Sequence, residues 1–300
     1  MTANGNRVGI EVSSSFFRAV SIDEKDAIAA TFSATVLSDE ERTSQLVTFI
    51  KRLKTELEFD RLGIAFPGLV DRGAQRVAFS ALVPEHTDVD LVSAIRSETA
   101  LEVTIENDAN AAAFGEYKVG AGRGSRNLFY ITLGEGVGGA FIFDGEIWRG
   151  AAGFAGEFGY VPIDAEGTKL EEVASRENIV RRIRARIHQD NTSSLYNVSE
   201  EGITLEAIIK AAKKDDDFAQ MMLKRTGTYV GSAVASVINL LNIERIVIGG
   251  EIMTAKHLVA DAIIQRSKEL SFGPSFESTK IVAGKLGENA AAIGAALLAN

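Results

Sequence analysis

A glycine-rich run with an acid between its first two glycines, TLGEGVGGAFIFDGE, spans residues 132–146. An apolar stretch precedes it, and three of its glycines, Gly134, Gly136 and Gly138, alternate with other residues. Glycines at such a turn let backbone N–H groups approach a ligand closely, and the usual ligand is a phosphate. Glu135 adds a negative charge among these donors. The run therefore combines the backbone of a phosphate-binding loop with a side chain that repels phosphate.

Three polar residues, Glu106, Asn107 and Asp108, directly follow a predicted strand at 103–105. A helix is predicted to start next, so the simplest role of Asp108 or Asn110 is an N-cap. Ligands of α/β proteins bind beyond the carboxyl ends of strands, which makes Asn107 and Asp108 candidates for a ligand site as well. A carboxylate in that position can accept the proton of a sugar hydroxyl.

Two further acids stand near glycine-rich turns, Glu157 in GFAGEFGYVPID and Glu171 in LEEVAS. Glutamates in such surroundings are mostly solvated. Neither residue alone indicates a site.

The elements that must position these residues open in the same way twice. A strand at 8–12 is followed by a serine turn and a second strand at 17–22. A strand at 128–133 is followed by the glycine run and a second strand at 139–143. Short apolar runs joined by turn residues predict two hairpins.

Each half then alternates helices with strands, which is typical of α/β proteins. The apolar spacing of residues 46–57 predicts one such helix, with Ser38 or Asp39 as its cap. We expect two duplicated α/β domains that face a cleft, 1–117 and 118–300. A last helix near 289–298 is expected to pack back on the first domain. The alternative is one large α/β domain whose hairpins are unrelated.

Composition limits the class of protein. Hydrophobic residues make up 46% and charged residues 24% of the 300 residues, as in soluble globular proteins. The net charge of −9 argues against a nucleic-acid or anionic-membrane partner. No apolar run reaches the ~18 residues of a membrane span, and the N-terminal MTANGNRVGIEV does not have the pattern of a signal peptide. We therefore expect a cytoplasmic protein.

Several segments occur in the order found in the ROK family, which the chain resembles over nearly its whole length. That family holds bacterial glucokinases, fructokinases, N-acylmannosamine kinases and sugar-responsive repressors. The resemblance implies an α/β fold of the actin-like, hexokinase-type ATPase class. The segments are GIAFPGLVD (63–71), ENDANAAAFGE (106–116), the long block from 132 to 164, LEEVAS (170–175) and IVIGGEI (246–252).

The resemblance also implies a sugar site. Asp108 matches the catalytic base that takes the proton of the attacking hydroxyl, a step that phosphoryl transfer requires. The matching sugar-binding residues offer acceptors to several hydroxyls, and they are Gly68, Asn107, Glu157, Tyr160 and Glu171. Tyr160 stands where the family usually has a histidine, so it does not reproduce the geometry of an imidazole.

The nucleotide site implied by the resemblance departs from the family pattern. The family reads D-x-G-G-T where this chain has Glu11, Val12, Ser13, Ser14 and Ser15. Loss of both glycines hinders close backbone approach to a phosphate, although serine hydroxyls can donate and Glu11 can lie near Mg²⁺. Further on, Gly249 and Gly250 are expected beside the nucleotide, and Glu251 follows them with another carboxylate.

The second loop reads G-T-G in the family and Gly134-Glu135-Gly136 here. Two like unit charges about 4 Å apart repel by about 4 kcal/mol at an effective dielectric constant of about 20, or about three decades of ATP affinity. In the competing interpretation, Glu135 holds Mg²⁺ or pairs with a nearby arginine, Arg123 or Arg126, and so helps the nucleotide to bind.

A structural zinc is not expected. Only AEGTK (165–169) separates Asp164 from LEEVAS, where the family has a cysteine-rich loop, and the chain has no cysteine. A thiolate zinc site and disulfides are therefore excluded.

Two functions remain open. The first is an ATP- and Mg²⁺-dependent sugar kinase acting on a hexose or related sugar. The second is a catalytically degenerate sugar-binding relative that acts as a sensor or partner. A DNA-binding repressor is disfavoured, because only seven residues precede the first expected strand. The resemblance also implies a homodimer or a higher homo-oligomer.

Overall fold

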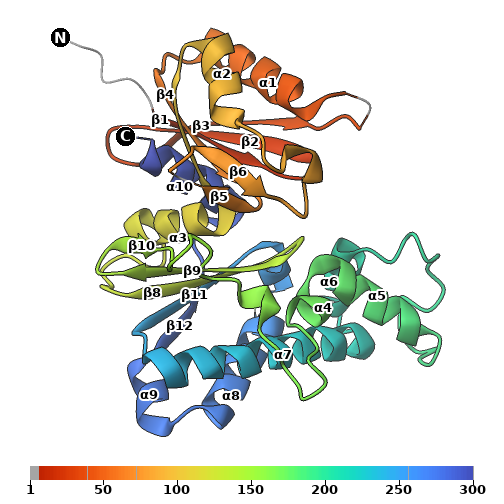
Figure 1. The fold of residues 1–300 in the computed structure, drawn as a ribbon. Coiled ribbons are helices and arrows are strands. Elements are labelled where there is room, and N and C mark those ends of the chain that lie inside the picture. Colours follow the sequence, from red (N-terminus) through yellow and green to blue (C-terminus); the bar gives the residue numbers. More distant parts are fainter. Residues whose placement is uncertain (1–6, 39, 72, 256, 300) are drawn as a thin grey trace. The chain divides into compact units, whose positions relative to one another are not determined.

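The computed structural model describes residues 7–38, 40–71, 73–255 and 257–299, and the chain divides into two compact units (Figure 1). The first unit comprises 1–124, 140–155 and 288–300, and the second comprises 125–139 and 156–287. The predicted boundary between 117 and 118 lies inside a helix, whereas the first change of unit follows Gly124. A later change of unit passes through one strand, between Gly139 and Ala140.

The first unit contains a five-stranded sheet in the order β3-β2-β1-β4-β7. β1 pairs antiparallel with β2 and parallel with β4, which in turn pairs parallel with β7. A two-stranded sheet of β5 and β6 accompanies it. The strands are β1 (Arg7–Val12), β2 (Phe16–Ile22), β3 (Ile28–Thr35), β4 (Arg61–Phe66), β5 (Leu69–Asp71), β6 (Arg76–Phe79) and β7 (Glu102–Asn107).

Strand alternation gives each face of this sheet its own partner. Val8, Ile10 and Val12 of β1 are fully buried in one hydrophobic core with α1 and α2. Gly9, between them in sequence, faces the helix α10 instead. The helices of this unit are α1 (Arg42–Glu56), α2 (Leu91–Thr99), α3 (Asp108–Val119) and α10 (Ala290–Leu298).

Close approach between α10 and its neighbours depends on glycine. A Cβ added at Gly9 would lie 2.0 Å from the carbonyl oxygen of Ala292, and one added at Gly294 would lie 1.6 Å from that of Ala111. The helix expected at 289–298 is therefore present, and it packs against β1 and α3 of the first unit (Figure 1).

The second sheet has the order β10-β9-β8-β11-β12. Numbered by their sequence within each sheet, both sheets have the order 3-2-1-4-5, as expected for two duplicated halves. The strands are β8 (Leu128–Leu133), β9 (Val137–Phe143), β10 (Glu146–Trp148), β11 (Arg245–Gly249) and β12 (Lys280–Ala283).

The second unit also contains α-helices, of which the long α7 packs along α8 (Figure 1). They are α4 (Glu171–Ala174), α5 (Arg176–Ile187), α6 (Leu205–Ala212), α7 (Asp217–Leu241), α8 (His257–Leu270) and α9 (Gly273–Ser278). Short 3-10 helices occur at Pro84–His86, Phe158–Tyr160, Glu251–Ala255 and Gly287–Asn289. Within the described ranges, no helix is long and apolar enough to cross a bilayer.

Candidate functional site

Asp108 lies where β7 ends and α3 begins. The N-cap of α3 is Asn107, whose side chain accepts a 2.9 Å hydrogen bond from the backbone N–H of Asn110. The simplest prediction, that Asp108 or Asn110 caps the helix, is therefore wrong. Asp108 is the first helical residue, where the helix dipole favours a negative charge.

Asn107 fixes the orientation of Asp108. Its side-chain amide donates to the carbonyl oxygen of Gly68 (2.9 Å) and to Oδ1 of Asp108 (3.0 Å). The backbone N–H of Ala109 donates to the same Oδ1 (2.9 Å). Because both amide hydrogens of Asn107 are used, any bond from this side chain to a sugar hydroxyl must use its oxygen.

Gly68 can be no other residue at this point. Its φ is +142°, and an added Cβ would lie 2.4 Å from the carbonyl oxygen of Phe79. The carbonyl group of Gly68, a predicted sugar contact, and the side chain of Asn107 are therefore held together within the first unit.

Glu106 supports this arrangement, and the sequence analysis assigned it no role. It is 3% exposed, and its Oε1 accepts from the backbone N–H of Asn107 (3.1 Å) and from Nδ2 of Asn110 (3.0 Å). Arg149 donates from Nη2 to Oε2 of Glu106 at 2.6 Å. The available signal was a glutamate directly after the apolar Ile105 of the strand, since a buried carboxylate is unfavourable without a partner.

Glu11, at the end of β1, is the acid that stands in for the aspartate of the family's first phosphate loop. Its Oε2 is 3.0 Å from Nη1 of Arg18. Burial raises the pKa of Glu11 to about 7 against the lowering effect of Arg18, and the negative charge of Asp108 adds to the rise. The two carboxylates therefore influence each other's charge within the first unit.

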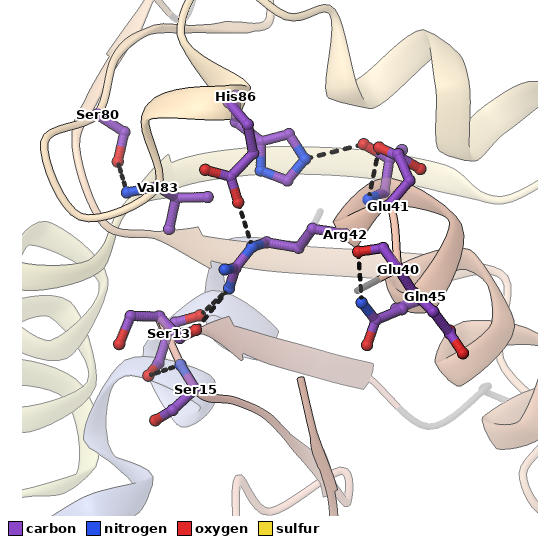
Figure 2. A network of polar contacts seen from close by, with 12 residues as sticks. Ser13, Ser15, Glu40, Glu41, Arg42, Gln45, Ser80, Val83 and His86 are labelled. Carbon is purple, nitrogen blue, oxygen red and sulfur yellow. Dashed lines mark hydrogen bonds and ion pairs between the residues drawn. The ribbon is translucent and has the colours of Figure 1, made fainter. Parts of the chain in front are cut away.

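Several backbone groups of the serine turn, residues 13–15, are hydrogen-bonded within the protein. The N–H of Ser13 donates to the carbonyl oxygen of Phe16 (3.0 Å), and that of Ser15 donates to Oγ of Ser13 (3.3 Å). Arg42 donates from Nη1 to the carbonyl oxygens of Ser13 (2.8 Å) and Ser14 (2.9 Å), as Figure 2 shows. The backbone N–H groups of Ser13 and Ser15 therefore have intramolecular acceptors.

The second loop closes on itself and on Glu171. The N–H of Gly134 donates to the carbonyl oxygen of Gly136 (3.0 Å), and the N–H of Val137 donates to Oε2 of Glu171 (3.0 Å). A Cβ at Gly136 would lie 3.0 Å from the same carboxylate oxygen. Glu171, expected among the sugar ligands, thus supports the predicted phosphate loop directly. Gly138 lies in the following strand, β9.

Glu157 lies near Glu171 in the second unit. Although Glu157 keeps an exposed surface, its surroundings partly desolvate the carboxyl group and, with the charge of Glu171, raise its pKa. Tyr160 is 60% exposed, and Nζ of Lys169 lies 4.0 Å from the centre of its ring. That distance is typical of a cation–π contact.

The short bridge after Tyr160 is held by a turn. Asp164 accepts from the backbone N–H of Thr168 (2.9 Å), and the N–H of Leu170 donates to the carbonyl oxygen of Val161 (3.0 Å). Among the described residues, no three His, Cys, Asp or Glu side chains form a group suited to a metal ion.

Arg176 is the cation beside the acidic second loop. Its backbone N–H donates to the carbonyl oxygen of Gly134 (2.7 Å), and its guanidinium makes a bidentate ion pair with Glu251 (2.5 and 2.6 Å). The hydrogen bonds that Arg176 donates to Glu251 raise the pKa of Arg176, and the charge of Glu135 contributes to that rise. In the sequence, Arg123 and Arg126 lie near Glu135 and are its predicted counter-charges. In the folded chain, Arg176, which directly follows LEEVAS, also acts on the charge of Glu135.

A pocket of about 470 Å³ adjoins Glu251. Gly249 and Gly250 precede Glu251 at the end of β11, and an added Cβ at Gly250 would lie 2.3 Å from the carbonyl oxygen of Leu133. The lining residues mix apolar and charged side chains and are Leu205, Glu206, Ile209, Lys210, Lys213, Lys214, Glu251 and Thr254.

The predicted site residues thus fall into two groups, each assembled within its own unit. Glu11, the serine turn, Gly68, Asn107 and Asp108 lie in the first unit. The second loop, Gly249, Gly250 and the residues Glu157, Tyr160 and Glu171 lie in the second.

Two sheets of one strand order place the protein in the class of actin-like, hexokinase-type ATPase folds. The chain belongs to the ROK family, whose sequence profile matches residues 7–300.

Relatives of this chain include both enzymes and regulators. The glucokinase of Thermotoga maritima is 33% identical over 246 residues, which cover 78% of this chain and 77% of that protein. The xylose repressor of Bacillus subtilis is 27% identical over 241 residues, which cover 78% of this chain and 59% of the repressor.

Among solved structures, a ROK family glucokinase from Streptomyces griseus in complex with glucose and AMPPNP matches with a TM-score of 0.89. It is 27% identical in sequence, and the match covers 98% of this chain and 99% of that one.

Proposed function

We propose that this protein is an ATP-dependent sugar kinase with Asp108 as its general base. The observation that carries the proposal is the fixed carboxylate of Asp108 at the start of α3. Two donors, Asn107 and the backbone of Ala109, converge on its Oδ1. Phosphoryl transfer depends mainly on positioning and on a base for the attacking hydroxyl, and a preoriented carboxylate supplies both.

The supporting residues follow from the same network. Glu106 and Arg149 hold Asn107, which holds Asp108, so these residues keep the base in one orientation. Glu157 and Tyr160 supply further polar groups for sugar hydroxyls. The sugar class is a hexose or a close relative, which the glucose complex of the Streptomyces griseus enzyme supports.

ATP would use the second unit. The pocket beside Glu251 combines the apolar Leu205 and Ile209 with three lysines, which suits a base or ribose joined to phosphates. Bound Mg²⁺ would neutralise charge on the phosphates, and Glu11 is the carboxylate of the first loop that could lie near it.

Calorimetry and turnover together test the proposal. ATP–Mg²⁺ and a panel of hexoses are titrated separately into the protein, and sugar phosphate is then measured with both present. We expect binding of ATP–Mg²⁺ and of at least one hexose, and ATP-dependent phosphorylation of that hexose. Absence of sugar phosphate across the panel, with intact sugar binding, would reject the kinase assignment.

The second candidate is a sugar-binding sensor without turnover. The serine turn favours it, because most of its backbone donors are already used and both expected glycines are absent. The repressor relatives show that the family includes regulators. A sensor is distinguished by sugar binding that does not change with ATP–Mg²⁺ and yields no phosphorylated product.

A further inference from the structure

Charged side chains from distant segments meet beside the second glycine loop. Arg176 opens α5, and Glu251 opens the 3-10 helix after β11, so 75 residues separate the two partners of the ion pair. Oε1 of Glu251 lies 3.6 Å from where a Cβ of Gly134 would stand. The bidentate pair therefore lies directly against the loop expected to receive phosphate.

Acidic groups outnumber the arginine here. Glu251 is paired with the guanidinium of Arg176, and the charges of Glu135 and Glu206 also act on it and raise its pKa. The side chains of Arg176 and Glu251 remain 42% and 31% exposed. A pair this accessible to water adds little to folding stability, so a purely structural role explains it poorly.

We propose that Arg176 is the phosphate ligand of the second loop and that Glu251 occupies it until a nucleotide binds. This inference rests on the proposed ATP-binding function and names the residue that carries it. A guanidinium forms the same two-pronged contact with a phosphate as with a carboxylate, so binding exchanges one acceptor for another. The exchange also supplies the positive charge that offsets Glu135.

The location supports this exchange. The backbone N–H of Arg176 is bonded to Gly134, which fixes the origin of the side chain next to the loop. Glu251 also lines the pocket proposed for the nucleoside, so a bound nucleotide would lie beside both members of the pair.

Calorimetry with two ligands isolates the phosphate contribution. ATP–Mg²⁺ and adenosine, which has no phosphate, are titrated into the parent, Arg176→Gln, Glu251→Gln and the double variant. Arg181→Gln, an exposed arginine on the same helix, is the matched control.

We expect Arg176→Gln to weaken ATP–Mg²⁺ binding by about tenfold or more, the size of one charge-assisted contact, while adenosine affinity changes by less than about threefold. Glu251→Gln should tighten ATP–Mg²⁺ binding, because the competing carboxylate is gone. The double variant should match Arg176→Gln, and Arg181→Gln should match the parent. Circular dichroism establishes that each variant is folded.

An unchanged or tighter ATP affinity in Arg176→Gln would overturn the inference, as would equal losses for ATP and adenosine. Sugar phosphorylation by the parent is measured in parallel. If the parent phosphorylates a sugar and Arg176→Gln leaves ATP affinity unchanged, this inference is rejected and the kinase assignment stands. Arg176-dependent ATP binding without turnover on any sugar rejects the kinase alone. A parent that binds no ATP rejects both.

Discussion

The role of Asp108 as a base can be tested with a substitution that replaces one oxygen of its side chain by nitrogen. Asparagine at this position keeps an oxygen that accepts from Asn107 and Ala109, so the local geometry survives the change. The amide cannot take a proton at neutral pH. Asp108→Asn should therefore lower turnover by about two to four orders of magnitude while sugar affinity stays within a few-fold.

Turnover and sugar calorimetry on the purified variant check this prediction. Asp90→Asn is the matched control, because Asp90 caps α2 in the same unit through a bond from Ser93 that asparagine can also accept. Turnover of Asp108→Asn within a few-fold of the parent would remove Asp108 from the role of base.

Glu135 tests the charge of the second loop. From the sequence alone, repulsion between Glu135 and phosphate predicts that Glu135→Thr increases ATP–Mg²⁺ affinity by up to about a thousandfold. Arg176 lies near enough to influence that charge, so we now expect a gain of about tenfold, reduced at high salt. Calorimetry at two salt concentrations measures both effects. Weaker binding in the variant would show that Glu135 assists the nucleotide.

Glu11 makes stability depend on pH. Its pKa is about 7 in the folded protein against 4.5 for an ordinary glutamate, so the folded state binds the proton more tightly. The resulting stabilisation is fully present below the unfolded value and is lost as pH rises through the folded one. Glu11→Gln does not ionise, so its stability relative to the parent should increase by up to about 3 kcal/mol between about pH 5 and 8.

Urea unfolding across that pH range checks the prediction, with the exposed Glu58→Gln as the control. The pairing with Arg18 exists only while Glu11 is ionised and is already part of its folded pKa, so the slope is the informative quantity. A stability difference that stays flat from pH 5 to 8 would contradict the raised pKa.

At the scale of elements, the start of α1 depends on a side chain that local preference ranks low. Glu41 is the N-cap of α1 and accepts from the backbone N–H groups of Thr43 (2.9 Å) and Ser44 (2.6 Å). The predicted cap Ser38 is therefore wrong, and Asp39 lies outside the described residues. Glutamate is not among the preferred caps, which explains the miss.

The close packing of Gly294 in α10 predicts how a larger residue there would change stability. Gly294→Ala would force a Cβ into the backbone of α3, where the carbonyl oxygen of Ala111 is 1.6 Å away. We expect a loss of unfolding free energy of about 3 kcal/mol or more, since rigid backbone must move. Gly273→Ala is the control, because nothing lies within 4 Å of its added Cβ. Equal urea midpoints for the two variants would show that α10 can shift freely.

At the scale of the whole molecule, folding is predicted to need no zinc. The chain has no cysteine, and the turn at Asp164 holds the short bridge through its own hydrogen bonds. Exhaustive chelation should leave the melting temperature unchanged. A large drop, with metal detected by elemental analysis in the untreated protein, would reveal a site built on residues such as His188 or His257.

Sequence alone was sufficient for the fold class, while the role of Asp108 as base stays a prediction. Strand alternation in β1 and the repeated hairpin openings depend on side chains a few residues apart, which a linear pattern records directly. Asp108, at the end of a strand and the start of a helix, is likewise a local feature. The family resemblance then supplied its expected role.

The tertiary structure decided which charges meet. Arg149 reaches Glu106 across 43 residues, and Arg176 reaches Glu251 across 75. Neither pairing leaves a trace in local spacing, because any arginine can reach any acid that the fold brings within a few ångströms. Only the folded loop shows that Glu171 accepts a hydrogen bond from the backbone N–H of Val137, while its assignment to a sugar stays a prediction. Side-chain contacts between distant segments follow from how strands are ordered in a sheet, and that order exists only once the chain has folded.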